Sequence, residues 1–81
     1  MPATSQLVDI FRDTLDLPAE VDVKTLAYRQ VREWDSVGHM QLVAALESEF
    51  DIMFDTQDIL DMSSFEKAIE ILGKYDVVIT D

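Results

Sequence analysis

Three side chains that could do chemistry lie within a short stretch of the chain, namely Asp35, Ser36 and His39. Ser36 and His39 are three positions apart, which puts them on one side of a helix and could pair a nucleophile with a base. Such a pair also needs an orienting third group and donors for an oxyanion, and no glycine-rich segment offers those donors. We therefore expect that the chain is not an enzyme, and we interpret His39 as a surface or partner-contacting residue.

Four aspartates in the second half of the chain raise the question of a calcium site. They are Asp51, Asp55, Asp58 and Asp61. An EF-hand loop needs ligands at alternating positions, a central glycine and a terminal glutamate. This run has a different spacing and no glycine, so we predict no metal site.

The segment that follows Ser36 has the pattern of an amphipathic helix over about residues 36–49. Apolar residues recur there at steps of three and four and predict one buried face. They are Val37, Met40, Val43, Ala44, Leu46 and Phe50. Gln41, Glu47, Ser48 and Glu49 lie off this face and should meet water. The side-chain oxygen of an Asp or Ser at the start of a helix can accept a hydrogen bond from a backbone N–H that has no partner within the helix. Ser36 is therefore either an ordinary helix cap or a surface residue whose hydroxyl another protein can reach.

Three more helical segments flank this one. The first should end near Leu17-Pro18, because proline disfavours helix in the residue before it. Its apolar residues are Leu7, Val8, Ile10, Phe11 and Leu15. A short helix is predicted over about 56–61, capped by Asp55 or Thr56. The last helix should begin at a capping box of Ser63 and Glu66 and end near Gly73. Its apolar residues are Phe65, Ala68, Ile69 and Leu72.

Residues 18–35 show no period and form a long connection with one short helical turn at about 24–28. The connection carries enough apolar residues to cross the helices: Val21, Val23, Leu26, Tyr28, Val31 and Trp34. These segments together predict an all-α fold, a small four-helix bundle of three main helices and one short helix with a long first loop. We expect a single domain over 1–81, with a core over about 5–75 that includes Met40, Met53, Met62 and Ile69. The tail over 76–81 either packs on the bundle or frays.

Composition excludes several classes of protein. The 81 residues include 6 basic and 17 acidic ones, for a formal net charge of −11. Such a chain is repelled by nucleic acids and attracted to basic patches on partner proteins. It has no cysteine, no signal peptide pattern and no apolar run near the ~20 residues of a membrane span. We expect a cytoplasmic monomer that binds no nucleic acid and does not span a membrane.

The stretch Asp35-Ser36-Val37, followed by an amphipathic helix that ends Leu46-Glu47-Ser48-Glu49-Phe50, resembles the acyl carrier protein family. The resemblance extends from about Leu7 to about Tyr75. It implies that Ser36 carries a covalent 4′-phosphopantetheine arm, which a phosphopantetheinyl transferase takes from coenzyme A. An acyl intermediate would hang on this arm as a thioester, and the core could open to shelter it between helices.

The resemblance also implies which residues meet partner enzymes. Asp35 lies at the transferase contact, although a plain capping role is equally compatible with its position. Val37 is an apolar residue at an exposed position and suits a hydrophobic anchor. Gln41, Glu47 and Glu49 would face basic patches on acyl-loading, ketosynthase or acyltransferase-type enzymes. Gln41 departs from the acidic residue that many family members carry.

The sequence around Ser36 departs from the commonest members of the family. It is Glu33-Trp34-Asp35-Ser36-Val37-Gly38-His39, whereas housekeeping fatty-acid carriers have Gly-Ala-Asp-Ser-Leu-Asp and peptidyl carriers have glycines just before the serine. It is more similar to discrete carriers of polyketide or other specialised assembly. The alternatives are a peptidyl or D-alanyl (aminoacyl) carrier, and an acidic helical interaction module without a prosthetic group.

Overall fold

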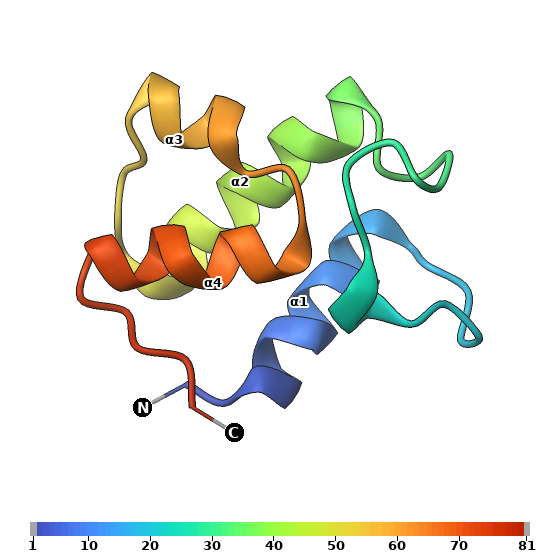
Figure 1. Ribbon diagram of the computed structural model, residues 1–81, viewed down its shortest axis with the longest axis horizontal. Coiled ribbons are helices and arrows are strands. Elements are labelled where there is room, and N and C mark those ends of the chain that lie inside the picture. Colours follow the sequence, from blue (N-terminus) through green and yellow to red (C-terminus); the bar gives the residue numbers. More distant parts are fainter. Residues whose placement is uncertain (1, 81) are drawn as a thin grey trace.

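The computed structural model describes residues 2–80, and this part of the chain is helical, as predicted (Figure 1). Its elements are α1 (Thr4–Leu15), the 3-10 turn η1 (Val23–Thr25), α2 (Ser36–Phe50), α3 (Thr56–Asp61) and α4 (Phe65–Lys74). Three main helices and one short helix, with a long connection before α2, confirm the predicted all-α bundle. None of the described helices is both long enough and apolar enough to cross a membrane.

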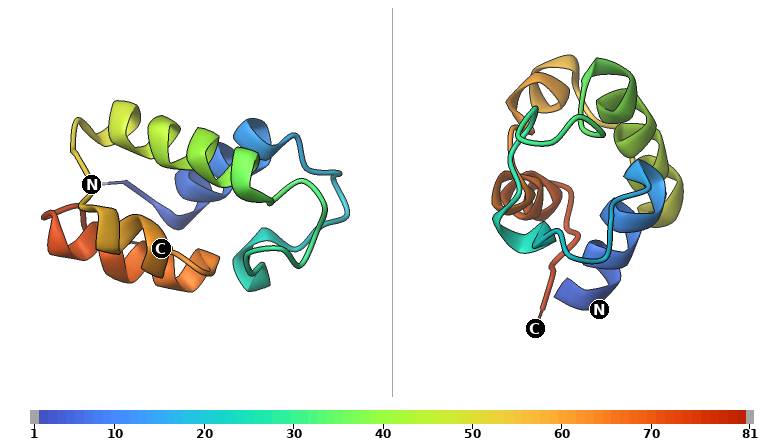
Figure 2. Two further views of the ribbon diagram at one scale, coloured as in Figure 1. Left: turned by 90° about the horizontal axis from the view of Figure 1, so that it is seen from above. Right: turned by 90° about the vertical axis from the view of Figure 1, so that its right-hand side faces the viewer.

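The helices surround one interior, with α1 and α2 on one side and α3 and α4 on the other (Figure 2). α1 buries Leu7, Phe11 and Leu15, which follow the helical period. Phe11 is central, because its ring makes edge-on contacts with Phe65 of α4 at 5.0 Å and with Trp34 of the connection at 5.5 Å. The connection before α2 is therefore held to the core by a fully buried tryptophan.

The buried face of α2 differs from the predicted one. Gly38, Leu42, Val43 and Leu46 are buried, whereas Val37, Met40 and Ala44 are exposed. The reason is the close approach at Gly38, where an added Cβ would lie 2.3 Å from the Glu33 carbonyl oxygen and 3.0 Å from Leu15 Cδ2. α2 thus turns its glycine toward α1 and the connection, and this rotation brings Val37 and Met40 to the surface.

The ends of two helices also differ from expectation. α1 ends at Leu15, two residues before Leu17, because Asp16 adopts the left-handed conformation with φ of 52° and Leu17 N–H bonds back to the Arg12 carbonyl. The predicted capping box of Ser63 and Glu66 is wrong, because Ser64 caps α4 by accepting from Lys67 N–H at 3.0 Å. The backbone carbonyl of Ser63 instead accepts from Tyr28 N–H at 2.9 Å, next to a bridge between Ala27 and Ser64 that joins the connection to the start of α4.

The tail packs on the bundle as far as residue 80, and residue 81 lies outside the described residues. Val77 and Ile79 are half-buried against the core. Thr80 N–H bonds to the Pro2 carbonyl at 2.9 Å, and the Thr80 carbonyl accepts from Thr4 N–H at 2.7 Å. These bonds form a single parallel bridge between the two ends of the described chain.

Candidate functional site

Ser36 is the first residue of α2, and it is exposed. The helix is capped by the residue before it, since Asp35 Oδ1 accepts from Gly38 N–H at 2.9 Å. The interpretation of Ser36 as an ordinary cap is therefore wrong. Its hydroxyl lies 3.2 Å from the Tyr28 hydroxyl, and this contact joins the head of α2 to the connection.

The position of Ser36 has a defined electrostatic character. The N-terminus of a 15-residue helix carries partial positive charge and backbone N–H groups without helical partners. Both features favour a negatively charged group on the Ser36 oxygen. The neighbouring Asp35 carboxylate opposes such a group, although its capping bond to Gly38 fixes it on the helix terminus.

A small cavity lies close to Ser36, between α2, α3 and the connection. Its volume is about 120 Å³. It is lined by Tyr28, His39, Ile59, Leu60, Met62 and Ser63. Tyr28 both lines the cavity and contacts Ser36, so the cavity and the serine share one wall.

His39 is half-buried and has both ring nitrogens engaged, which corrects its interpretation as a surface or partner-contacting residue. Trp34 Nε1–H donates to His39 Nδ1 at 2.9 Å, and His39 Nε2 lies 2.8 Å from the Ile59 carbonyl oxygen of α3. The imidazole stacks on the Trp34 indole at 6.1 Å between centroids. Since Ser36 pairs with Tyr28 instead, the site holds no serine–histidine pair.

The exposed side of α2 beside Ser36 is uncharged and mostly apolar, and Gln41 is an exposed polar residue on it. Val37 is 67% exposed and Met40 is 54% exposed, and no Asp, Glu, Lys or Arg occurs between Ser36 and Leu46. Ala44 continues this surface one turn further on, and Met53, 79% exposed, borders Ala44 in a shared hollow. We call Val37, Met40, Ala44 and Met53 the apolar stripe. Met40, Met53, Met62 and Ile69 were expected in the core. Of these four, Met62 is buried and Ile69 is half-buried against the core, whereas Met40 and Met53 are exposed.

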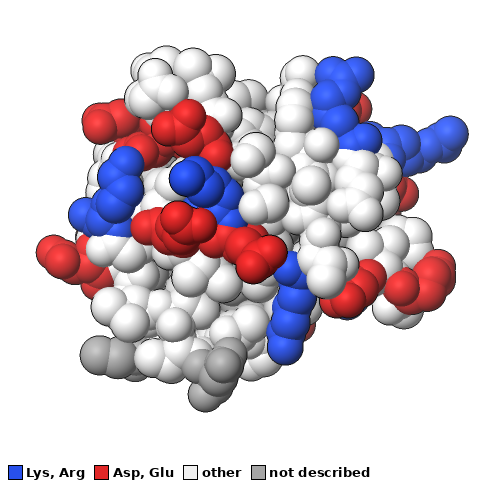
Figure 3. All heavy atoms as spheres, viewed as in Figure 1, with Lys and Arg blue, Asp and Glu red and all other residues white. Residues whose placement is uncertain are grey.

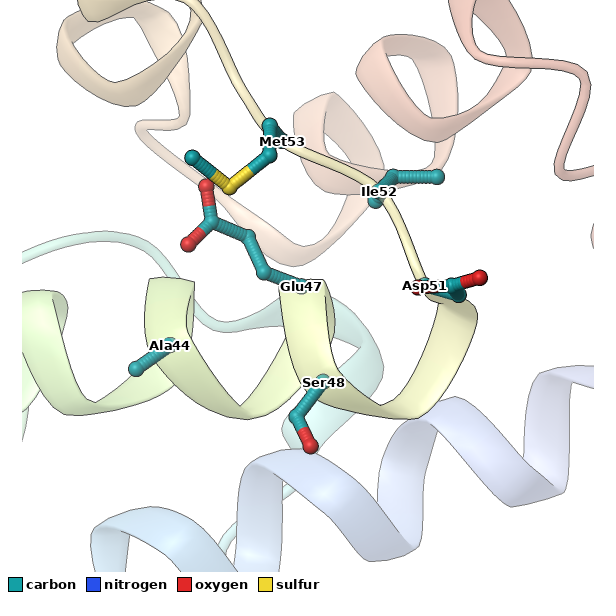
Figure 4. Close-up of a pocket in the computed structure, with 6 residues that line it drawn as sticks. All are labelled: Ala44, Glu47, Ser48, Asp51, Ile52 and Met53. Carbon is teal, nitrogen blue, oxygen red and sulfur yellow. The ribbon is translucent and has the colours of Figure 1, made fainter.

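The hollow at the far end of the stripe is where the acidic residues of α2 begin (Figure 4). Its other lining residues are Glu47, Ser48, Asp51 and Ile52. In Figure 4 the side chain of Met53 lies toward Glu47, whereas Ser48 points away from both. The surface of α2 therefore changes from apolar near Ser36 to acidic near its C-terminus.

The predicted recognition residues do not form one uniform surface. Asp35 and Val37 flank Ser36, and Gln41 is exposed on the same helix. Glu49 is exposed, with its carboxylate 3.4 Å from the Gln6 amide of α1. Glu47 was expected to meet water, but it is half-buried and accepts from Phe54 N–H at 2.9 Å, so it holds the turn after α2.

Asp58 of α3 is a polar residue whose role sequence reasoning missed. It is 3% exposed, and its two oxygens bond to Lys74 Nζ and Tyr75 hydroxyl, each at 2.5 Å. The bond from Lys74, aided by that from Tyr75, lowers the pKa of Asp58 below its usual 3.8. The same bonds raise the pKa of Lys74 above 10.5 and that of Tyr75 above 10.0. No local pattern could have revealed this group, because its partners are 16 and 17 residues away.

Metal ligands do not gather in the described part of the chain. Over residues 2–80, no group of three or more His, Cys, Asp or Glu side chains is arranged to hold an ion. Among the four aspartates considered for calcium, Asp58 has both oxygens engaged within the protein.

The fold and site define a small helical bundle with an exposed serine at the head of its longest described helix. Beyond that class the comparisons add nothing, because no protein-family model, no curated protein and no solved structure matches this chain.

Proposed function

We propose that this chain is an acyl carrier protein whose Ser36 hydroxyl accepts a 4′-phosphopantetheine arm from coenzyme A. The observation that carries the proposal is that two adjacent residues at the start of α2 have different roles. Asp35 caps the helix, so the exposed Ser36 hydroxyl is left for a reaction. A serine whose only role was to cap the N-terminus of a helix would be expected to accept the capping hydrogen bond itself.

The residues around Ser36 fit a phosphodiester on its oxygen. The positive end of α2 favours the negative charge, and the Tyr28 hydroxyl lies within hydrogen-bond distance of the serine oxygen. When attached, the arm supplies a flexible thiol that carries the acyl group as a thioester, a chemistry that this cysteine-free chain lacks by itself. Ser36 thus provides the attachment point, and Asp35 and Tyr28 hold its surroundings in place.

The surface of α2 supports docking of partner enzymes in two zones. Next to Ser36, the apolar stripe would contact apolar residues of a transferase or of an acyl-loading, ketosynthase or acyltransferase-type enzyme. Farther along, Glu49 and Asp51 would meet basic residues of the same partner. The departures of the sequence around Ser36 favour a freestanding carrier of polyketide or other specialised assembly.

The proposal is tested by incubating the pure protein with coenzyme A and a broad-specificity phosphopantetheinyl transferase, followed by intact mass and peptide mapping. We expect one arm, on Ser36. Ser36→Ala should take none, whereas Ser48→Ala, which removes another exposed serine of α2, should be modified like the unaltered chain.

The opposite result would favour a different class of protein. If the folded chain took no arm from two different transferases, Ser36 would not be a carrier serine. The apolar stripe and the hollow beside Glu47 and Asp51 would then indicate an acidic helical module that binds a basic partner without a prosthetic group. Transfer of an amino acid rather than an acyl group onto the loaded chain would identify an aminoacyl or peptidyl carrier.

A further inference from the structure

One side chain ties α3 to α2 beside the cavity next to Ser36. His39 projects from α2, takes a hydrogen bond from Trp34 on one ring nitrogen and reaches the Ile59 carbonyl of α3 with the other. We call this arrangement, Trp34–His39–Ile59, the histidine crossbar. It links the connection, α2 and α3 through a single imidazole.

The chemistry of the two partners fixes the state of the imidazole. An indole N–H can only donate, so His39 Nδ1 must accept and carries no proton. A carbonyl oxygen can only accept, so His39 Nε2 must carry the proton and donate it to Ile59. The crossbar therefore requires one neutral tautomer, and that tautomer satisfies both partners at once.

The crossbar acts on a helix that has few other attachments. α3 has six residues, too short to be stable without support from its surroundings. Asp58 bonds to Lys74 of α4 and to Tyr75, and the Tyr75 hydroxyl also accepts from Asp55 N–H at the start of α3, whereas the crossbar is the polar tie of α3 to α2. Leu60, on the outer side of α3, is 71% exposed and adds little packing.

The cavity that the crossbar borders is small. His39 and Ile59 both line it, and its volume of about 120 Å³ is smaller than the roughly 150 Å³ of a protein cavity that holds one benzene molecule. The bond from His39 to Ile59 holds α2 and α3 together along one wall of this cavity, and an octanoyl chain is longer than the space that the cavity offers.

We propose that His39 is a specificity-determining residue that holds α3 against α2 and restricts the space beside Ser36 to a short acyl group. The inference rests on the proposed function, because the acyl group would arrive on an arm at Ser36. A short group, such as butyryl, occupies the cavity while the crossbar stays closed. An octanoyl group stays outside, exposed to water and to partner enzymes.

Two substitutions separate the two bonds of the crossbar. His39→Asn places an amide oxygen near the position of Nδ1 and can still accept from Trp34, but it is too short to reach Ile59. His39→Gln places an amide nitrogen near the position of Nε2 and keeps the donor to the Ile59 carbonyl. His39→Gln is thus the matched control for the bond between α2 and α3.

The first readout uses the unmodified chain and needs no arm. The amides of Ile59 and Met62 donate to the Asp55 and Asp58 carbonyls, and their hydrogen exchange reports the opening of α3. We expect exchange at both amides to be about fivefold faster in His39→Asn than in His39→Gln, for the loss of one hydrogen bond. Equal exchange rates in the two variants would overturn the proposal.

The second readout uses chains loaded from butyryl- or octanoyl-coenzyme A, with cleavage of the thioester by hydroxylamine compared with the same acyl group on free coenzyme A. In the unaltered protein and in His39→Gln, we expect cleavage of the butyryl group to be slowed and cleavage of the octanoyl group to match that on coenzyme A. In His39→Asn, cleavage of the octanoyl group should be slowed as well. An octanoyl group equally shielded in all three proteins would overturn the proposal.

Failure of the proposed function is distinguishable from failure of this inference. If the mass showed no arm on Ser36, the carrier assignment would fall. Ser36→Cys then offers the only thiol of the chain for direct attachment of a butyl or octyl group. A shift of the Ile59 and Met62 signals with the butyl but not the octyl group would support the crossbar, and the same shift with both would contradict it.

Discussion

Asp35 and Ser36 are adjacent, both are polar and exposed, and either could cap a helix, yet only Asp35 does so. The difference is one of geometry, because Asp35 is in the extended conformation of a capping residue while Ser36 already belongs to the helix. The sequence shows that one of the two must cap α2. It does not show which, and the availability of the Ser36 hydroxyl depends on that choice.

Asp58 gives a pH-dependent prediction at the scale of a single residue. Because its pKa is lowered in the folded state, the stability it contributes is present above its unfolded value of 3.8 and is lost as the pH falls through the folded pKa. Lys74 and Tyr75 have raised pKa values, so their contribution is present below 10.0 and is lost at higher pH. We expect Asp58→Asn to lower the melting temperature between pH 3.8 and pH 10.0. Below pH 3.8, the difference in melting temperature between this variant and the unaltered protein should become smaller.

The control for this experiment is Asp13→Asn, which changes the net charge equally at an exposed position of α1. Thermal melts monitored by circular dichroism across the acid range would measure both variants. A difference between Asp58→Asn and the unaltered protein that stayed constant down to the lowest pH would contradict the assigned role of the Lys74 bond.

At the scale of the element, α2 shows how one glycine sets the orientation of a helix. Val37, Met40 and Ala44 have the spacing of a buried face, and so do Leu42 and Leu46. Periodicity alone cannot choose between two such faces when most of the helix is apolar. Gly38 decides, because only a residue without a side chain fits against the Glu33 carbonyl.

The two glycines of the chain therefore respond to substitution in opposite directions. Gly38→Ala places a methyl group against the Glu33 carbonyl and should lower the free energy of unfolding by about 1–3 kcal/mol, in spite of the better helix propensity of alanine. Gly73→Ala meets nothing within 4 Å in α4 and should raise the free energy of unfolding by about 0.5–1 kcal/mol. Urea titration measures both values, and an equal sign for the two would contradict this account.

The apolar stripe predicts how partners respond to changes in α2. Val37→Ser and Met40→Gln should each raise the KM of the phosphopantetheinyl transferase for this protein by about fivefold and leave its melting temperature nearly unchanged, because both side chains are mostly exposed. Val78→Ser is the matched control, since Val78 is 50% exposed in the tail and outside the stripe. An equal effect of all three substitutions would contradict docking at the stripe.

The number and order of helices were predictable from periodicity, and the structure confirms them. The remaining features depend on contacts between distant residues. Ser63 and Ser64 are equally good caps by local pattern, and Ser64 caps α4 where residues 26–28 of the connection bond to Ser63 and Phe65. His39 carries no signal that it reaches Ile59, twenty positions away. Sequence reasoning thus proposed Ser36 as a candidate, but it did not predict the contact of Ser36 with Tyr28 or the bonds of His39 to Trp34 and Ile59.

At the scale of the whole molecule, charge opposes compactness. The chain carries a net charge of −11 within principal extents of 30 × 27 × 18 Å. Acidic and basic side chains interleave over α3 and α4, where Lys67 pairs with Glu70 at 3.9 Å and Lys74 pairs with Asp58 (Figure 3). Six basic residues cannot offset seventeen acidic ones, so repulsion persists across the rest of the surface.

Salt should therefore stabilise the folded protein. The Debye length falls from about 30 Å at 0.01 M salt to about 8 Å at 0.15 M. The first value equals the longest extent of the molecule, 30 Å, and the second is a fraction of it. We expect the melting temperature to rise over this range, as repulsion in the folded state is screened. A melting temperature independent of salt would show that local ion pairs have already balanced the excess charge.

The pairing of Pro2 and Thr4 with Thr80 brings the two ends of the described chain together, and in Figure 1 they lie at the bottom while α2 begins at the upper right. A tether fused to either end would emerge from the same corner. A protein anchored to a bead or a sensor chip through that corner would hold the Ser36 side turned outward, and joining the two ends by a short peptide would give a circular chain with its helices in the same order.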